Sequence, residues 1–452
     1  MPQTAVKKNI SFTSRDLLKL IFPLVVEQFL AIAVGLCDSL MVASVGEAAV
    51  SAVSLVDTVN ILLISAFTAL ATGGAIVAGQ YLGRREPENA GKAAEQLLFF
   101  MLVLSLAITC LLYLFKNAIL GGLFGQIDAD VMAHCNTYYL ITEASIPFLA
   151  LYSAGAALFR VMGNSAVSMK ISFIMNGINI AGNALMIYGL HAGVEGVAVP
   201  TLVSRIVAAA AVFPLLRNQN LPVHLPKGKR FTCNRRMIRN IVSLGIPNGI
   251  ENSLFQLGKI LLLSVASAFG TASIAANAVG NNIASFQILA AQAIGVGMVT
   301  VVSQCVGAQD FAKARAYTRK LMIWAYIAGA VSNVIILLIL PGIISAYNIS
   351  AEAGELAGKI VWMHGIMAMI FWPMSFTLPQ SIKAAGDTKF TMIVASVSMW
   401  VFRVLFGVWF ARDLNFGVLG IWMAMFIDWF VRIAFFVVRY RGHKWEQKFL
   451  RG

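Results

Sequence analysis

A succession of long apolar segments constrains the fold of this chain more than any other feature. A helix that crosses a bilayer needs about 20 mainly apolar residues, and twelve segments of the 452-residue chain meet that requirement. They lie at about 16–43, 52–83, 93–115, 133–160, 167–190, 194–217, 238–267, 276–306, 314–344, 356–383, 388–411 and 417–440. Because bilayers admit only helices and closed barrels, the sequence predicts an all-α polytopic membrane protein with twelve transmembrane helices.

The balance of apolar and charged residues agrees with lipid as the main solvent. The chain is 59% apolar and 12% charged, whereas soluble chains are about 45–50% apolar and about 25% charged. The net charge of +14 does not indicate nucleic-acid binding, because no stretch is polar enough to build a basic face on a folded domain. We therefore expect no nucleic-acid partner.

The basic residues predict the orientation in the membrane. With successive joints assigned alternately to the two sides, 27 of the 34 Lys and Arg residues fall on the side of the N-terminus, three fall on the other side and four lie within spans. The three are Lys116, Lys359 and Arg412. Since Lys and Arg favour the cytoplasmic side, both termini are predicted to be cytoplasmic and the protein to lie in the cytoplasmic membrane.

The two halves of the chain are related by an internal repeat. One constant displacement aligns Pro23 with Pro247, Glu27 with Glu251, Gly46 with Gly270, Gly73 with Gly297 and Gln80 with Gln304. Later the register slips by one position, so that Gly163 meets Gly386. Six spans in each half give both halves the same orientation, which predicts two six-helix lobes related by a parallel repeat, as in rocking transporters.

The expected order is a cytoplasmic N-terminal segment at 1–15, an N-lobe at 16–217, a basic cytoplasmic linker at 218–237, a C-lobe at 238–440 and a cytoplasmic tail at 441–452. The five cysteines form no CxxC pair, and the sequence has no HExxH, no GxGD with paired aspartates and no His-rich motif. We therefore expect no disulfide framework, cofactor or intramembrane enzyme. The two-lobed repeat argues against a channel.

Five separated motifs resemble, in order, those of the multidrug and toxic compound extrusion (MATE) transporters. The segment PLVVEQFLAIAVGLCDSLMVASVGEAAVSAVSL is similar to the first helix of that family, and QYLGRREPENA and QCVGAQDFAKA to its joints after helices two and eight. FRVMGNSAVSM and IKAAGDTKFTM resemble the joints after helices four and ten, and GVEGVAVPTLVS resembles the entry to helix six. The resemblance covers about residues 14–440.

The resemblance implies a monomeric, two-lobed secondary antiporter that exports organic cations or other amphipathic compounds in exchange for H⁺ or Na⁺. Its partners would be those small molecules and membrane lipid. The alternative is a lipid-linked oligosaccharide flippase of the same superfamily, the multidrug, oligosaccharidyl-lipid and polysaccharide exporters. A flippase would carry extra helices and a more cationic cavity, so the count of twelve disfavours it, whereas Arg205 keeps it open. The sequence leaves the substrate open.

Asp38 is the strongest candidate for cation coupling. An ionisable side chain in hydrocarbon costs on the order of 3 kcal/mol or more, so it marks a functional candidate. Asp38 is expected in the outer half of the first span, and the resemblance gives its position the coupling role. Glu27 lies eleven residues earlier, about three helical turns and 20° of rotation away, so we expect both carboxylates to face the same cavity.

Two polar stripes accompany these carboxylates. Asn176, Asn179 and Asn183 lie at i, i+3 and i+7 of the fifth span, and Thr201 and Arg205 are four residues apart on the sixth. The resemblance brings Asn179, Asn183 and Thr201 to the coupling site, while Asn176 and Arg205 are candidates for a substrate cavity. The asparagines also have a purely structural interpretation, because amides join membrane helices.

The ion is left open between H⁺ and Na⁺, with H⁺ preferred. A lone carboxylate in a poorly hydrated pocket favours its neutral form and takes a proton. Na⁺ would need an oxygen cage, which Asp38, Asn179, Asn183, Thr201 and a water would supply. Many relatives carry Asp where this chain has Asn183, so the site keeps one carboxylate instead of two. No other metal site is expected.

Glu251 in the second lobe is the candidate for a second cation site, since it matches an acidic position that some relatives use for Na⁺. The accompanying Asp on the tenth span is not evident in WMHGIMAMIFWPMSFTLPQS, so this site is expected to be incomplete. Lys259 lies two turns away on another face, which argues against its pairing with Glu251. Asp428 and Arg432, at i and i+4, predict an intrahelical ion pair.

Pro23 and Pro247 are expected in the first turns of two helices that the repeat relates. Each proline removes one backbone hydrogen bond and permits a kink. The kinks are interpreted either as simple shape or, at Pro23, as a device that lets the first helix bend when Asp38 is protonated.

Overall fold

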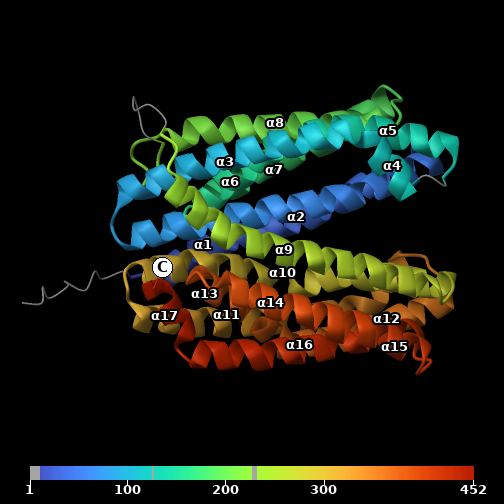
Figure 1. Cartoon of the computed structure of the whole chain (residues 1–452). Coiled ribbons are helices and arrows are strands. Elements are labelled where there is room, and N and C mark those ends of the chain that lie inside the picture. The colour runs from blue at the N-terminus through green and yellow to red at the C-terminus, as the bar shows by residue number, and fades with distance from the viewer. Residues whose placement is uncertain (1–10, 125–126, 226–231, 452) are drawn as a thin grey trace, which may run out of the picture. The chain divides into compact units, whose positions relative to one another are not determined.

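The structure, a computed structural model, describes residues 11–124, 127–225 and 232–451. Within these ranges the chain is helical apart from turns and short connections (Figure 1), so the predicted all-α class is confirmed. Residues 1–10, 226–231 and 452, from the predicted N-terminal segment, linker and tail, lie outside the described residues.

The chain divides into two compact units, Ser14–Gly249 and Met1–Thr13 with Ile250–Gly452, which we call the first and the second unit. Helices of the first are α1 (Ser14–Ala43), α2 (Glu47–Gly83), α3 (Pro87–Leu114), α4 (Lys116–Phe124), α5 (Ala129–Ala144), α6 (Ile146–Val161), α7 (Ser165–Ala184), η1 (Leu185–Gly189) and α8 (Glu195–Leu216). The division falls within α9 (Arg235–Ser267). The predicted lobe boundary at 218–237 stays a prediction.

The second unit contains the helices that follow α9. They are α10 (Thr271–Gly307), α11 (Phe311–Ala346), α12 (Ala351–Trp372), η2 (Pro373–Thr377), α13 (Leu378–Ala384), α14 (Thr388–Val397), η3 (Ser398–Leu405), α15 (Phe406–Arg412), α16 (Gly417–Arg441) and α17 (Lys444–Arg451). Segments η1, η2 and η3 are π-type turns that continue a helix. Pro373 opens η2, where its missing N–H leaves one hydrogen bond of the helix unmade.

Ten helices are long and apolar enough to cross a membrane within the described ranges, or eleven when α5 and α6, bent by 43° at Ser145, count as one span. Pro147 lies just after this bend. The remaining predicted span, 238–267, lies in α9, which is not among those helices although it is 33 residues long. Polar side chains such as Asn248, Glu251 and Lys259 interrupt its apolar surface.

Backbone conformation repeats in the register that the sequence predicts. Left-handed φ angles occur at Gly46 and Gly270 (139° and 88°), at Arg85 and Gln309 (60° each), and at Gly163 and Gly386 (80° and 94°). The first two pairs have the same displacement as Pro23 and Pro247, and the third pair includes the slip of one position. Each position lies in a turn between two helices, where this conformation reverses the chain. The repeat predicted from the sequence is therefore present in the fold.

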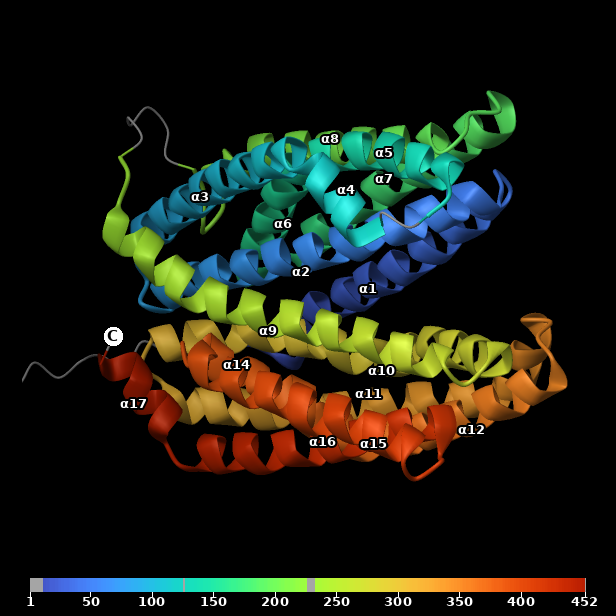
Figure 2. The same cartoon turned by 45° about the vertical axis from the view of Figure 1, so that its right-hand side comes forward.

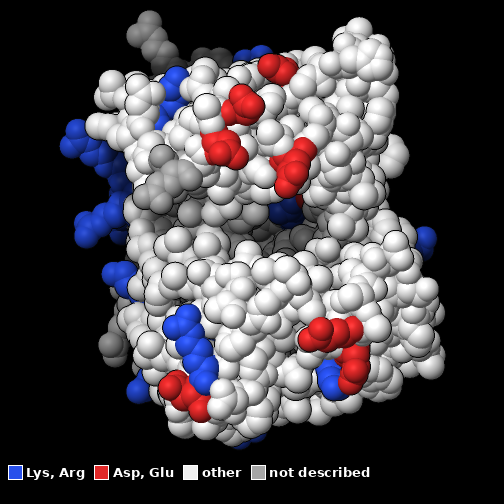
Figure 3. All heavy atoms as spheres, turned by 90° about the vertical axis from the view of Figure 1, so that its right-hand side faces the viewer, with Lys and Arg blue, Asp and Glu red and all other residues white. Residues whose placement is uncertain are grey.

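One end of the first unit carries exposed carboxylates (Figure 3). Glu47, Asp128, Asp130 and Glu195 are exposed where α2, α5 and α8 begin. Lys116, at the start of α4, is the basic residue that the sequence places on this side. That this end faces the outer side of the membrane stays a prediction.

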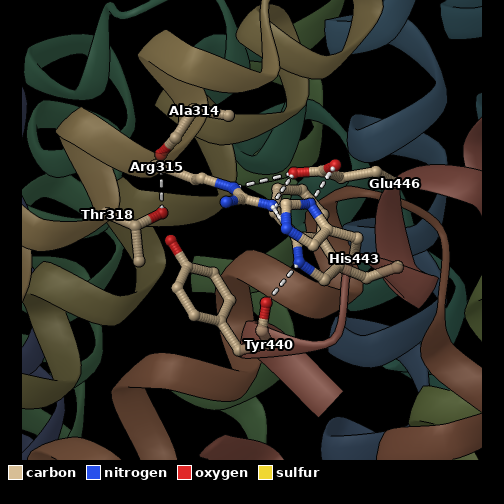
Figure 4. Close-up of polar contacts among 7 residues, drawn as sticks. Ala314, Arg315, Thr318, Tyr440, His443 and Glu446 are labelled. Atoms are coloured by element: carbon tan, nitrogen blue, oxygen red, sulfur yellow. Dashed lines mark hydrogen bonds and ion pairs between the residues drawn. The ribbon is translucent and has the colours of Figure 1, made fainter. Parts of the chain in front are cut away.

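The predicted tail forms a helix, α17, that packs on α11 of the same unit (Figure 4). The Trp445 ring stacks on Tyr440 at 5.5 Å between centroids and meets Phe311 of α11 edge-on at 6.0 Å. Arg315 of α11 donates from Nε to Oε1 of Glu446 at 2.8 Å. A buried tryptophan and an ion pair thus hold the tail.

Candidate functional site

The site lies where α7 packs between α1 and α8 in the first unit (Figure 2). α7 and α8 approach closely because Gly182 has no side chain. A Cβ at Gly182 would lie 2.7 Å from Cβ of Pro200, which no ordinary contact allows. Small residues at such crossings let the polar side chains of two membrane helices meet. Here the approach brings Asn179 of α7 to Thr201 of α8.

Four side chains predicted to converge do lie together. Asn183 donates from Nδ2 to Oδ1 of Asp38 at 2.7 Å. Asn179 donates from Nδ2 to the Thr201 hydroxyl at 3.0 Å, and its Oδ1 lies 3.5 Å from Nδ2 of Asn183. The Thr201 hydroxyl in turn donates to the carbonyl oxygen of Val197 at 2.8 Å. One chain of hydrogen bonds therefore links α1, α7 and α8.

One acceptor oxygen of this cluster has no hydrogen-bond donor in the described part of the chain. Asn183 is fully buried, and its Oδ1 has no hydrogen-bond partner in the described part of the chain. A buried acceptor without a donor costs about 1–3 kcal/mol, which a bound metal cation would offset. Oxygens of Asp38, Asn179, Asn183 and Thr201 are the ligand types that Na⁺ prefers, while Asp38 alone suffices for H⁺.

Of the two candidates for a substrate cavity, Asn176 bonds within its own helix, whereas Arg205 acts on Asp38. Asn176 donates to the Ser172 hydroxyl at 3.4 Å on its own helix. Arg205 donates from Nη1 to the Ser145 hydroxyl at 2.6 Å, and its charge acts on the carboxyl group of Asp38. Arg205 therefore contributes positive charge beside the predicted coupling residue.

Arg205 also acts on two carboxyl groups that the sequence marks as functional candidates only because they are ionisable residues within spans. Asp57 of α2 accepts hydrogen bonds from Tyr138 at 3.1 Å and from Asn60 at 3.3 Å, and Glu143 of α5 is fully buried. Both interact electrostatically with Arg205. Their signal in the sequence was an ionisable residue within an apolar span, but nothing in the sequence showed that α2, α5 and α8 meet here.

Glu27 does not join the Asp38 cluster. Its carboxylate pairs with Arg160 of α6 and accepts a hydrogen bond from Ser168 of α7 at 2.6 Å. Eleven residues along α1 place Asp38 about 16 Å away along the helix axis. The sequence assigned Arg160 to a cytoplasmic joint, whereas its side chain is only 19% exposed and holds Glu27. The coupling role of Glu27 stays a prediction.

Glu251 is likewise held by a cation. Lys383 of α13 donates from Nζ to its Oε1 at 2.9 Å, and the Lys383 side chain is 4% exposed. The expectation that Lys259 does not pair with Glu251 agrees with this, because Lys383 takes that place. A carboxylate neutralised by a buried lysine is a poorer ligand for a second cation. A cation site at Glu251 stays a prediction, and the ion pair argues against it.

The predicted ion pair between Asp428 and Arg432 is confirmed, with Nε and Oδ1 2.7 Å apart. Arg403 of η3 adds a second cation at 4.0 Å from Asp428, and the Ser398 hydroxyl donates to Asp428 Oδ1 at 2.5 Å. Four residues from η3 and α16, namely Ser398, Arg403, Asp428 and Arg432, thus form one buried polar cluster.

Pro23 and Pro247 lie inside helices, not in their first turns. Pro23 comes nine residues after Ser14, where α1 begins, and Pro247 comes twelve residues after Arg235, where α9 begins. The expectation was wrong, since even the predicted spans 16–43 and 238–267 begin seven and nine residues before these prolines, which is about two helical turns or more. A proline this far inside leaves one hydrogen bond of the helix unmade, which is compatible with the predicted kink.

No group of three or more His, Cys, Asp or Glu side chains that could hold a metal ion occurs among residues 11–124, 127–225 and 232–451. A cation at Asp38 would therefore depend on amide and hydroxyl oxygens besides its one carboxylate.

Comparison with known proteins gives a consistent result. The family model MatE matches twice, at residues 23–185 and 247–409, and the two matches are in the register of the internal repeat. The chain is 26% identical to the uncharacterized transporter YisQ of Bacillus subtilis over 98% of both chains. It is 21% identical to a probable multidrug resistance protein NorM of Thermotoga maritima, over 98% of this chain and 95% of that one.

Among solved structures, the chain resembles the outward-facing conformation of a multidrug resistance MATE family transporter of the MOP superfamily. The TM-score is 0.87 at 19% identity, covering 97% of this chain and 96% of the other. The shared fold therefore extends over nearly the whole length of both chains.

Proposed function

The chain belongs to the MatE family of multidrug efflux transporters, and on this premise we propose that it is a secondary antiporter that exports organic cations or other amphipathic compounds in exchange for H⁺ or Na⁺. One observation carries the proposal. Asp38, in an apolar span, is held by Asn183, whose own amide oxygen is buried without a partner in the described part of the chain.

The exchange follows from competition for one anionic site. Asp38 attracts both a coupling cation and a positively charged substrate, and a low-dielectric environment strengthens both attractions. Occupation of Asp38 by the cation therefore weakens substrate binding, which links entry of the one to release of the other. H⁺ is the proposed ion because the cluster contains a single carboxylate.

We further propose that the protein lies in the cytoplasmic membrane as a monomer, with both termini in the cytoplasm. The distribution of Lys and Arg supports this orientation. The relatives are transporters, which supports a role in transport without chemical conversion of the substrate and without a cofactor.

The direct test uses purified protein in liposomes loaded with a fluorescent organic cation. An imposed pH gradient without Na⁺, and then a Na⁺ gradient at equal pH, are each applied alone. We expect the pH gradient to drive substrate movement. Movement under the Na⁺ gradient alone would assign Na⁺ instead. If neither gradient moves the substrate while a lipid-linked oligosaccharide is translocated, the protein is a flippase and the antiporter proposal is wrong.

A further inference from the structure

Glu143, at the end of α5, is buried without a hydrogen-bond donor for its carboxyl group among the described residues. Its exposed fraction is 0%, and neither Oε1 nor Oε2 has a hydrogen-bond partner in the described ranges. An ionised carboxylate in such surroundings would lose its hydration without gaining a hydrogen bond, which is strongly unfavourable. A protonated carboxyl group avoids most of that cost.

The helices packed against α5 supply no hydrogen-bond donor to Glu143 within the described ranges. Tyr113 of α3 and Tyr139 of α5 interact with it electrostatically, but their hydroxyls donate elsewhere, to the carbonyl oxygens of Leu140 and Leu112 at 2.5 and 3.2 Å. The charged residues of α4 and α6 are Lys116 and Arg160, and Arg160 is paired with Glu27.

Two charged groups on these helices interact with Glu143, Asp57 of α2 and Arg205 of α8. The other charged residues of α2, α3 and α8, namely Glu47, Glu88, Lys92, Glu95 and Glu195, are not among the groups that act on it. Three carboxyl groups, those of Asp38, Asp57 and Glu143, act on the single guanidinium of Arg205. None of the three lies within 4.0 Å of that guanidinium as an ion pair in the described part of the chain.

The three carboxyl groups differ in their donors. Asp57 accepts from Tyr138 and Asn60, and Asp38 accepts from Asn183. Since Glu143 accepts from none among the described residues, a proton shared among the three rests most favourably there. When Asp38 is neutralised, it no longer compensates the positive charge of Arg205, and that charge stabilises the ionised form of Glu143 more strongly. Occupation of Asp38 and protonation of Glu143 therefore oppose each other.

We propose that Glu143 is a second proton-binding residue of the first unit, that it carries a proton at neutral pH in the conformation described, and that this proton is exchanged during transport. The exchange during transport rests on the proposed antiport, whereas proton binding by Glu143 and its protonation at neutral pH do not. Proton release involves only cleavage of the carboxyl O–H bond, with the proton passing to water and the carboxylate facing Arg205.

Infrared absorption of the purified protein tests the protonation directly. The difference between wild type and Glu143→Gln at neutral pH should contain the C=O stretching band of a protonated carboxylic acid. Glu195→Gln, which changes an exposed glutamate of the same unit, should instead reveal the bands of a carboxylate ion. Carboxylate bands in the Glu143 difference would overturn the proposal. Size-exclusion chromatography shows that each variant is folded, and Glu143→Asp should restore the protonated band.

Transport in liposomes tests the exchange. Glu143→Gln should move fewer protons per substrate than wild type, and Glu143→Asp should restore the number. An unchanged ratio would overturn the exchange. If the wild type itself shows no gradient-driven transport, the proposed function fails, but the infrared result still decides whether Glu143 holds a proton.

Discussion

At the scale of single residues, both units contain a buried ion pair between a glutamate and a basic residue. Glu27 is paired with Arg160 and Glu251 with Lys383, and in each pair the cation precedes the glycine of a repeat-related turn by three residues. The internal repeat thus contains both members of the ion pair, the glutamate and the basic residue. A matched pair of buried ion pairs suits a structural role, since removal of one partner strands the other charge.

Removal of Arg160 alone should therefore harm the protein more than removal of the whole pair. Arg160→Met leaves the Glu27 carboxylate uncompensated and should cost about 3–5 kcal/mol, seen as a fall in melting temperature in detergent. The double variant Glu27→Gln/Arg160→Met should recover most of that loss. Equal destabilisation of the single and double variants would contradict this role of the pair.

These pairs also show what sequence could and could not predict about the site. Asp38, Asn179, Asn183 and Thr201 were found from polar residues in apolar spans and from the family resemblance. The partners Arg160 and Lys383 were missed because both precede a turn, where a basic residue normally faces water. Only the packing of α7 against both α1 and α6 shows that Arg160 turns inward, and sequence spacing carries no such information.

At the scale of helices, the coupling cluster depends on the close crossing of α7 and α8. Gly182→Ala would place a methyl group 2.7 Å from Cβ of Pro200, so the helices must separate and the contact between Asn179 and Thr201 must lengthen. Overpacking of this kind costs about 1–3 kcal/mol. We expect transport to fall at least about tenfold, which is about 1.4 kcal/mol, in a protein that is still folded.

The control for this change lies on the same helix. A Cβ at Gly177 meets nothing within 4 Å, so Gly177→Ala should transport as the wild type does. Equal transport by the Gly177→Ala and Gly182→Ala variants would show that the crossing does not position the cluster.

The C-terminal helix gives a second prediction at this scale. Trp445 is fully buried between Tyr440 and Phe311, and truncation of a buried tryptophan costs about 3–5 kcal/mol. Trp445→Ala should release α17 from α11 and speed tryptic cleavage after Lys444 at least about tenfold. Gln447→Ala, at an exposed position of the same helix, should leave the cleavage rate unchanged. Unchanged cleavage of Trp445→Ala would contradict the docking.

At the scale of the whole molecule, periodic features of the sequence predicted the fold. Apolar runs marked the spans, and the register of the internal repeat returned in the backbone turns and in the two MatE matches. Pro147 and Pro373 marked two spans as able to kink, but the angle of the bend between α5 and α6 and the three π-type turns were not predicted. They depend on hydrogen bonds that prolines and packing remove locally, and a hydropathy pattern averages over such details.

Orientation is testable with single cysteines. In an otherwise cysteine-free variant, Cys233, which is exposed, should react with a membrane-impermeant maleimide only after the cells are permeabilised. A cysteine introduced by Glu195→Cys, at the acidic end of the first unit, should react in intact cells. The reverse pattern would place the termini outside and contradict the predicted topology.

The central claim is that Asp38 couples cation entry to export, and its most direct test is substrate efflux from liposomes under a fixed pH gradient. The test compares wild type with Asp38→Asn and with Asp130→Asn, which changes an exposed aspartate of the same unit. The account predicts that Asp38→Asn inserts and folds but abolishes gradient-driven efflux, while Asp130→Asn retains it. Efflux by Asp38→Asn at the wild-type rate would contradict the account.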